Sequence, residues 1–226
     1  MMPTLLLTGA GGGIGFELAR QYAADGWHVI ATCRNPVAAG RLAALPGAIT
    51  VETLDVTDRA AVDDLAARYA GRPIDLLYLN AGINPQAGAA LADTDFAVWP
   101  QVFDVNVIAP FYMATCLIGN VAASERRLVV AMGSMAGSFA AAFPGNYVYR
   151  SSKAALHNVM KALAADVADR GISVVVMHPG QVRVPRVPDN PVAVEDSAAG
   201  IRRTLAAVGP ATTGRFMDYL GDPRPW

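Results

Sequence analysis

The stretch TGAGGGIG, residues 8–15, decides the fold class of this chain of 226 residues. It follows a short apolar run, residues 5–7, and it opens a segment in which Ile14, Leu18 and Tyr22 recur every four residues on one helix face. The order strand, glycine turn and helix leaves free backbone N–H groups at the positive end of a helix, where a pyrophosphate can bind. An ordinary tight connection is the alternative interpretation of such a turn taken alone.

Downstream of this turn, short apolar strands alternate with helical segments, which implies a parallel sheet. We therefore expect an α/β fold of a single domain over residues 1–226, a Rossmann-type doubly wound parallel sheet with helices on both faces. Residues 184–191 contain three prolines and are expected to form a loop, within a lid region at about 184–200. Strands are predicted at 5–7, 29–33, 49–54, 74–79, 128–132, 172–177 and 216–220, and helices at 14–26, 59–70, 95–118, 151–168 and 195–208.

Composition excludes several classes of function. The net charge is −1 and 53% of the residues are hydrophobic, so no basic field for nucleic acid exists. Residues 1–9 lack the basic start of a signal peptide, and polar residues, Gly or Pro interrupt every run before the ~18 apolar residues of a membrane span. Two cysteines and three scattered histidines favour neither a disulfide framework nor a metal site. We expect a cytoplasmic protein without metal, nucleic-acid or membrane partners.

The segment YRSSK places Tyr149 and Lys153 four residues apart, so both lie on one face of a helix. A neighbouring ammonium stabilises a phenolate, which makes the tyrosine usable as an acid or base well below its ordinary pKa of ~10. Such a pair taken alone is more often found on a surface. Its place after the fifth strand, in a chain with the glycine turn, favours a catalytic pair, whereas Tyr147 has no matching lysine.

The spacing T-G-x-x-x-G-x-G resembles that of the short-chain dehydrogenase/reductase family, and the match continues at four further motifs. These are Asp55-Val56 after the third strand, Asn80-Ala81-Gly82 after the fourth, the Tyr/Lys pair, and Pro179-Gly180-x-Val182 after the sixth. Leu79 replaces the first Asn of the family's N-N-A-G motif, and Val184 replaces a Thr near the nicotinamide carboxamide. The resemblance implies that a nicotinamide dinucleotide contacts Thr8, Gly9, Gly13, Ile14, Gly15, Arg34, Asp55, Val56, Asn80, Ala81, Gly82, Tyr149, Lys153, Pro179, Gly180 and Val182.

Arg34 indicates which nucleotide is preferred. An NAD-binding relative is expected to carry an acidic residue at the end of the second strand, but Cys33 stands there and Arg34 follows. A guanidinium can donate paired hydrogen bonds to a 2′-phosphate. We expect NADP(H), with NAD(H) less favoured, while a solvated surface arginine is the alternative, since neither Gly11 nor Gly12 supplies a second basic residue.

The resemblance also implies a catalytic tetrad of Asn106, Ser134, Tyr149 and Lys153. Ser134 follows the fifth strand and precedes the tyrosine by 15 residues, whereas the rival Ser138 precedes it by 11. Ser134 is preferred because ligand sites of doubly wound sheets lie at the carboxyl ends of the strands. A backbone cap is the alternative role for a serine in such a turn.

In the implied mechanism, the serine and tyrosine bind the carbonyl oxygen, hydride reaches the carbon, and the tyrosine donates a proton. The asparagine anchors a water path, and the lysine holds the nicotinamide ribose. The pattern is most similar to the C-factor-like, carbonyl reductase branch. Valines of the lid, with Met135 and Phe139, predict a mostly apolar pocket for small to medium ketones, aldehydes or quinones, and Arg183 and Arg186 could meet an anionic group or simply face solvent.

Two alternatives stay open: an oxidative NAD(P)-dependent alcohol dehydrogenase, and a cofactor-binding signalling or structural protein with little turnover.

The helices at 95–118 and 151–168 carry more apolar surface than one sheet face needs, which predicts a homodimer or homotetramer.

Overall fold

The computed structural model describes residues 2–141, 143–185 and 187–226 of the chain. Within these residues, seven parallel strands form one sheet in the order β3-β2-β1-β4-β5-β6-β7. The strands are nearly continuous apolar runs because both of their faces are covered. The expected doubly wound sheet is confirmed. Its strands are β1 (Thr4–Leu7), β2 (His28–Cys33), β3 (Ile49–Thr53), β4 (Leu76–Leu79), β5 (Leu128–Met132), β6 (Ser173–His178) and β7 (Phe216–Asp218).

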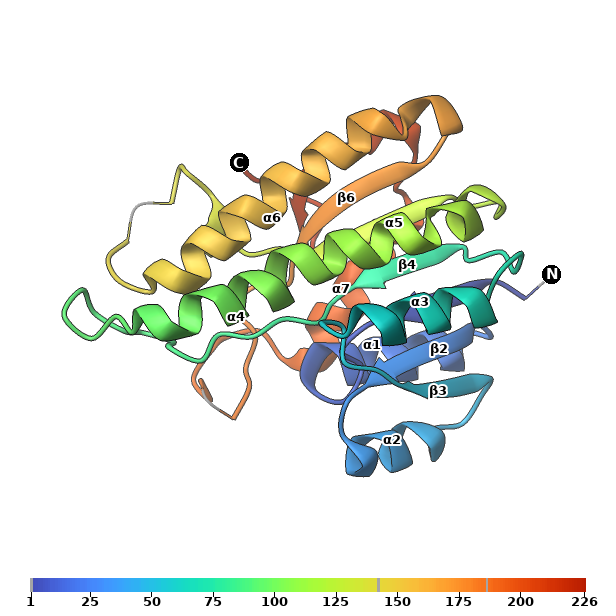
Figure 1. The fold of residues 1–226 in the computed structure, drawn as a ribbon, viewed down its shortest axis with the longest axis horizontal. Coiled ribbons are helices and arrows are strands. Elements are labelled where there is room, and N and C mark those ends of the chain that lie inside the picture. The colour runs from blue at the N-terminus through green and yellow to red at the C-terminus, as the bar shows by residue number, and fades with distance from the viewer. Residues whose placement is uncertain (1, 142, 186) are drawn as a thin grey trace.

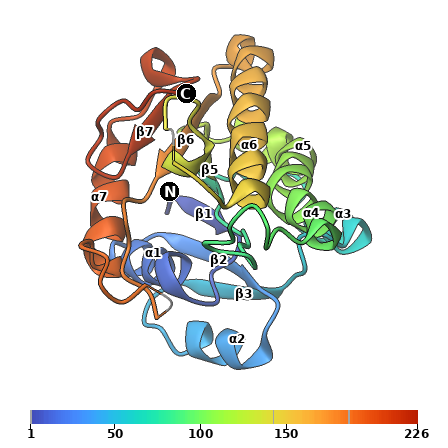
Figure 2. The same ribbon diagram turned by 90° about the vertical axis from the view of Figure 1, so that its left-hand side faces the viewer.

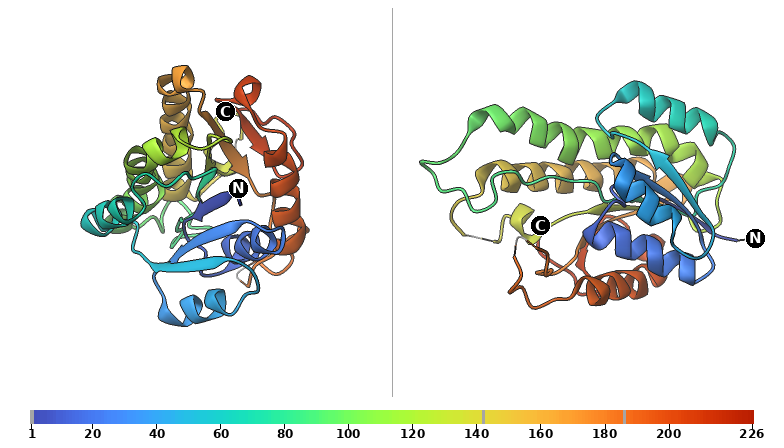
Figure 3. Two further views of the ribbon diagram at one scale, coloured as in Figure 1. Left: turned by 90° about the vertical axis from the view of Figure 1, so that its right-hand side faces the viewer. Right: turned by 90° about the horizontal axis from the view of Figure 1, so that it is seen from below.

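Helices form a layer on each face of the sheet (Figures 1 and 2). On one face α1, α2 and α7 seal one apolar cluster, and on the other face α3, α5 and α6 seal a second. Figure 3 shows the two layers from the opposite end and from below. The helices are α1 (Gly13–Ala24), α2 (Pro36–Ala43), α3 (Arg59–Arg68), α4 (Trp99–Phe103), α5 (Ala109–Ala122), α6 (Tyr147–Asp166) and α7 (Val194–Ala206).

The strand order places a crevice at one end of the sheet. β1 pairs with β2 on one side and with β4 on the other. From β1 the chain continues to β2 on one side, and from β4 it continues to β5 on the opposite side, so the strand order reverses between β1 and β4. Ligands of such sheets bind at this switch point, outside the carboxyl ends of the strands. The loops that follow β4, β5 and β6 gather at this end, which faces the viewer in Figure 2.

One helix is not foreseen by the sequence-based expectation, and another begins earlier than expected. α2 was not predicted, although Asn35 accepts a hydrogen bond from the Val37 amide at 2.8 Å and so caps its first turn. Asn followed by Pro is a known start signal that could have revealed this helix. α6 begins at Tyr147, four residues before the predicted start at Ser151, so Tyr149 lies in its first turn.

The helix expected at 195–208 is α7, which begins at Val194, so it occupies the second half of the region 184–200. Before it, main-chain bridges join Val182 to Val192 and Val184 to Val187. Arg186, one of the two arginines noted in the sequence, lies outside the described residues.

The long helix predicted at 95–118 is a helical stretch, but it is not uniform. A single π-helical turn, η2 (Asp104–Ile108), separates α4 from α5. Pro110 explains the change, since it has no N–H to donate to the carbonyl of Asn106 one α-helical turn earlier, and its ring crowds that carbonyl. The wider turn carries Asn106, which is fully buried. Such π-turns often accompany functional residues.

The stretch Phe96–Ala122 also passes the length and hydropathy test for a membrane span, with a mean hydropathy of 1.6 in its most apolar 18-residue window. We had expected no such segment, because polar residues interrupt the apolar run. Half of its most apolar window is buried inside the protein, where α5 packs on β4 and β5. The core helix of a soluble protein passes the same test.

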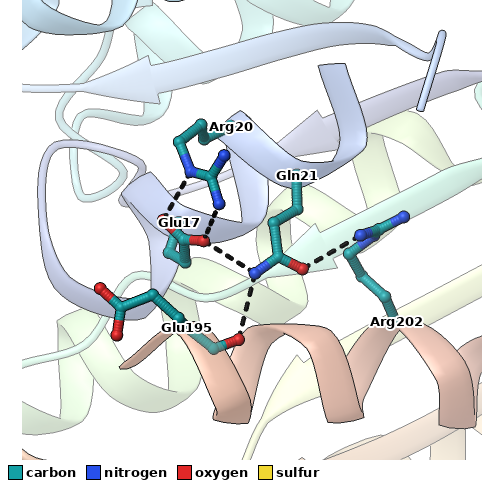
Figure 4. A network of polar contacts seen from close by, with 5 residues as sticks. All are labelled: Glu17, Arg20, Gln21, Glu195 and Arg202. Carbon is teal, nitrogen blue, oxygen red and sulfur yellow. Dashed lines mark hydrogen bonds and ion pairs between the residues drawn. The ribbon is translucent and has the colours of Figure 1, made fainter. Parts of the chain in front are cut away.

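A polar network joins α1 to α7 (Figure 4). Gln21 donates to the carboxylate of Glu17 at 2.7 Å and to the main-chain oxygen of Glu195 at 3.1 Å, and Arg202 donates to Gln21 at 3.0 Å. Arg20 donates to both oxygens of the Glu17 carboxylate. Because α1 begins at the glycine turn and α7 follows the lid, these bonds fix the two segments relative to each other.

We expect Gly15→Ala to destabilise the protein. A Cβ at Gly15 would lie 2.3 Å from the carbonyl oxygen of Gly9 and 2.7 Å from Nδ2 of Asn80, an overlap that costs ~1–3 kcal/mol of unfolding free energy or more. Gly12→Ala is the matched control, because a Cβ there meets no described atom within 4 Å. Urea unfolding of both variants tests this, and equal stabilities would contradict it.

Candidate active site

A cleft of about 680 Å³ lies at the carboxyl ends of the strands and runs from β2 past β1 to β6. This size is ordinary for a cofactor site. Most of the predicted site residues line it: Gly9, Ile14, Gly15, Arg34, Asp55, Val56, Asn80, Ala81, Gly82, Ser134, Tyr149, Lys153, Pro179, Gly180 and Val182. Thr8, Gly13 and Asn106 are predicted site residues that are not part of its lining.

Thr8 holds the two strands at the switch point together. Its hydroxyl accepts hydrogen bonds from the amides of Asn80 at 2.9 Å and Ala81 at 3.0 Å. In return, the Asn80 side chain donates to the main-chain oxygens of Thr8 and Gly9. Gly9, with φ at +67°, approaches Ala81 so closely that a Cβ would lie 2.8 Å from the Ala81 Cα. These residues pack the turn after β1 against the end of β4, beneath the cleft.

The start of α1 is open toward the cleft. Gly12, the N-cap residue, is extended, and among the described residues no side chain caps the first turn. The first N–H groups of this helix are therefore available to an anion, and the helix dipole favours negative charge there. The glycine turn thus fits a pyrophosphate.

At the far end of the cleft, Arg34 follows β2 and its side chain is 63% exposed. Its guanidinium lies 3.8 Å from the carboxylate of Asp55. The amide of Thr57 is the main reason that the pKa of Asp55 is lowered, with Arg34 adding to it. The charged arginine is therefore only loosely paired at an exposed site and can turn toward an anionic ligand.

Tyr149 and Lys153 come from the first two turns of α6, and both line the cleft. Nζ of Lys153 lies 5.6 Å from the centre of the Tyr149 ring and donates to the main-chain oxygen of Met132 at 2.8 Å. Burial lowers the pKa of Lys153 to about 8. The side chain is only 3% exposed, so little water screens its charge from the tyrosine.

Asn106 lies behind this pair rather than in the cleft. Its Oδ1 accepts from the amide of Ile83 at 2.8 Å, and its Nδ2 donates to the Ile83 carbonyl and to the hydroxyl of Ser152 at 3.0 Å. Ser152 donates in turn to the main-chain oxygen of Tyr149. The amide is thus fully used within the protein, and it ties the π-turn to the first turn of α6.

The structure separates the two candidate serines. Ser134 lines the cleft directly after β5, and its hydroxyl accepts from the amide of Ala136 at 3.1 Å. Ser138 is buried, and its hydroxyl donates to the main-chain oxygen of Trp226 at 3.3 Å. Ser134 is therefore the serine that a ligand in the cleft can reach.

Beyond Ser134, the cleft is less uniformly apolar than the sequence indicates. Val184 and Val187 line it as expected, but the amide residues Asn84, Gln181 and Asn190 line it too. Val192, Met135 and Phe139 are not among its lining residues; Met135 packs against an apolar cluster of the core, and Phe139 is 86% exposed. The amides went unnoticed in the sequence because nothing in their spacing marks them.

Two histidines lie close to the catalytic end, although no role was predicted for either. Burial is the main cause that lowers the pKa of His157 to about 3 and of His178 to about 4. The nearby charge of Lys153 adds to the effect at His157. Both side chains are neutral at physiological pH. Among the described residues, no group of three or more His, Cys, Asp or Glu side chains is placed to hold a metal ion.

A family model described as short chain dehydrogenase matches residues 3–191. The chain is 34% identical over 219 residues to 2-keto-3-deoxy-L-fuconate dehydrogenase of Xanthomonas campestris pv. campestris, covering 97% of this chain and 69% of that protein. It is 33% identical over 156 residues to the C-signal of Myxococcus xanthus, covering 68% and 93% of the two chains. The protein belongs to the short-chain dehydrogenase/reductase family.

Solved structures of carbonyl reductases are similar over the whole chain. Sniffer of Drosophila melanogaster superposes with a TM-score of 0.91 at 27% identity and full coverage of both chains. The NADPH-bound carbonyl reductase from chicken fatty liver gives a TM-score of 0.89 at 25% identity, covering 100% of this chain and 99% of that one. The expected family and the resemblance to its C-factor-like and carbonyl reductase members are confirmed.

We expect the stability to fall as the pH drops from about 6.5 toward 5. An unfolded histidine binds a proton near pH 6.5, whereas His157 and His178 stay neutral in the folded state because their pKa values are lowered. Each histidine then costs up to about 1.4 kcal/mol of unfolding free energy per pH unit below that point. Urea unfolding between about pH 7 and pH 5 measures this slope. A double variant, His157→Gln with His178→Gln, should flatten it, and an unchanged slope would show the assignment to be wrong.

Proposed function

We propose that the protein is an NADP(H)-dependent oxidoreductase that transfers hydride between the nicotinamide and a small to medium, mostly apolar carbonyl or alcohol. The observation that carries this proposal is one continuous cleft with Tyr149, Lys153 and Ser134 at one end and Arg34 at the other. The favoured direction is reduction of a ketone, an aldehyde or a quinone.

The residues present fit a nicotinamide dinucleotide. The uncapped start of α1 offers amides to the pyrophosphate, and Asp55 and Val56 line the cleft on the adenosine side. Arg34 would meet the 2′-phosphate, because no carboxylate occupies the end of β2. Pro179, Gly180 and Val182 would lie at the nicotinamide end, where Ser197 donates to the Pro179 carbonyl at 2.7 Å and fixes that turn. When bound, NADPH supplies the hydride.

The chemistry assigned to this chain is proton transfer and orientation. Ser134 and Tyr149 hold the carbonyl oxygen by hydrogen bonds, which polarise the carbonyl, and Tyr149 donates its proton to that oxygen as the alcohol forms. Lys153 stabilises the phenolate that remains, because its charge lies near the ring in a buried position. Asn106 fixes the main chain at Ile83 beside the lysine, where the proton path to solvent is proposed.

The amides in the lining bear on the substrate. Val184 and Val187 suit an apolar body, while the amide residue Gln181 adds polarity to the same lining. Similar proteins include a carbonyl reductase and a 2-keto-3-deoxy-L-fuconate dehydrogenase, so an oxidative role on a hydroxylated substrate is the second candidate, and the polar part of the lining favours it. A cofactor-binding role with little turnover is the third.

We also propose self-association, as a homodimer or homotetramer, in the cytoplasm. Phe96, Ile108 and Phe111 are large apolar side chains on the helical stretch 96–122, and all three are exposed. Contact with a second copy of the chain would bury these three side chains.

Tyr149→Phe is expected to lower kcat by about 10²–10⁴-fold, the usual contribution of a general acid, with little change in NADPH affinity. Absorbance at 340 nm with a panel of aldehydes, ketones and quinones measures this. Tyr147→Phe is the matched control, because Tyr147 lies two residues earlier on α6 and outside the cleft lining. Equal loss in both variants, or none in the first, would refute the assignment.

Arg34→Ala is expected to weaken NADPH binding by roughly 10- to 100-fold, since a hydrogen bond to a charged group is worth about 1.5–3 kcal/mol. NADH binding should change little because NADH carries no 2′-phosphate. Fluorescence titration with both nucleotides measures the ratio. Arg68→Ala, an exposed arginine paired with Glu52 on β3, serves as the control. An equal effect on both nucleotides would contradict the selector role.

A further inference from the structure

His157 fits into a niche formed by the loop that carries Ser134. It lies one turn after Lys153 on α6, so Tyr149, Lys153 and His157 follow one another along the same helix face. A Cβ at Gly133 would lie 2.7 Å from Nε2 of His157, and a Cβ at Gly137 would lie 2.9 Å from its Cε1. Glycine at both positions therefore lets this loop pack closely against its neighbours, the imidazole of His157 among them.

One hydrogen bond joins this imidazole to Ser134. The backbone amide of Ser134 donates to Nε2 of His157 at 3.3 Å. Nε2 must then carry a lone pair, so the ring is neutral with its proton on Nδ1. Protonation of the ring would put a second donor against the amide. Burial and the charge of Lys153 both oppose protonation, and they lower the pKa of His157 to about 3.

The far side of the ring has no polar partner. Nδ1 of His157 is buried, and within the described residues no hydrogen-bond partner reaches it. The ring packs instead against Phe216 and Trp226, with centroids 4.4 Å and 5.7 Å away. An unsatisfied buried N–H lowers stability, so an apolar side chain would suit this position better if only packing mattered.

We propose that His157 is a positioning residue of the active site, which holds the main chain of Ser134 so that the serine hydroxyl faces the carbonyl oxygen beside Tyr149. The proposal rests on the proposed function, because it assigns a role to Ser134 in binding that oxygen.

α6 then fixes the end of β5 at two points. Lys153 donates to the main-chain oxygen of Met132, and His157 accepts from the amide of Ser134, so the two bonds bracket Gly133. The helix that carries the proton donor thus also sets the position of the serine loop. Because Lys153 and His157 both extend from α6, which also carries Tyr149, their bonds fix the position of Ser134 relative to Tyr149 even though the two residues lie on different elements.

Trp226 supports this arrangement from outside. Its main-chain oxygen accepts from the hydroxyl of Ser138 at 3.3 Å and from the amide of Phe139 at 3.0 Å. Lys161, one turn after His157, places its ammonium 5.0 Å from the centre of the Trp226 ring. The remainder of the loop is thereby held against the same face of α6.

The experiment compares His157→Leu, His157→Gln and Ser134→Ala, and it includes the double variant of His157→Leu with Ser134→Ala. Leucine removes the acceptor and keeps an apolar side chain, whereas the oxygen of a glutamine can replace Nε2. We expect His157→Leu to lower kcat up to about tenfold, the value of one hydrogen bond. NADPH affinity should stay within about twofold, and glutamine should restore most of the rate. Met160→Leu, a buried change on the same helix, controls for packing.

The double variant separates positioning from a merely structural role. If His157 acts through Ser134, His157→Leu lowers kcat by less than about twofold when Ser134→Ala has already removed the serine hydroxyl. An equal loss in both backgrounds, or an unchanged kcat in His157→Leu, overturns the proposal. Nitrogen-15 spectra of the wild-type imidazole add a readout that needs no substrate. They should show a neutral ring protonated on Nδ1, and a proton on Nε2 would also overturn the proposal.

These results are distinct from failure of the proposed function. If wild-type protein turns over no carbonyl or alcohol with either nucleotide, the proposed function fails, while the nitrogen-15 spectra still decide whether His157 holds the Ser134 amide.

Discussion

The hydrogen bonds between Thr8 and Asn80 are the constraint on which the rest of the site depends. They tie the turn after β1 to the end of β4, the two strands at which the sheet order reverses. The tie brings Gly9 against Ala81 and Gly15 against Gly9, at distances that no side chain would permit. With the turn after β1 held in this place, the start of α1 faces the cleft. The same contacts thereby set the positions of the groups proposed to bind the nucleotide.

α6 plays the same organising role at the catalytic end. One helix carries the Tyr149 hydroxyl proposed as the proton donor, the buried ammonium of Lys153 and the imidazole acceptor of His157 on successive turns. Its bonds to Met132 and Ser134 reach the neighbouring strand, and its Ser152 meets Asn106 in the π-turn. The end of β5, the loop that carries Ser134 and the π-turn are therefore all bonded to α6. A single helix thus keeps the groups of the proposed active site aligned.

Burial sets the charge state of this end of the cleft. Lys153 is the only charged side chain that is buried there among the described residues of α6, and the loss of water lowers its pKa toward neutrality. The same environment keeps His157 and His178 neutral. Low screening strengthens the effect of the lysine on the tyrosine, while neutral imidazoles add no competing positive charge.

The sequence by itself determined the fold class, because the glycine turn, the alternation of elements and the Tyr/Lys spacing depend only on local geometry. Most of the site residues that it indicated line the cleft, since carboxyl ends of parallel strands meet at one edge. α2 was missed although its Asn-Pro start is local, and the start of α6 was placed one turn late. Only the tertiary structure showed that Ser134 lines the cleft while Ser138 is buried, that Val192, Met135 and Phe139 lie outside the cleft lining, and that His157 reaches the serine loop. These outcomes depend on contacts between residues distant in the chain, which no spacing within the sequence encodes.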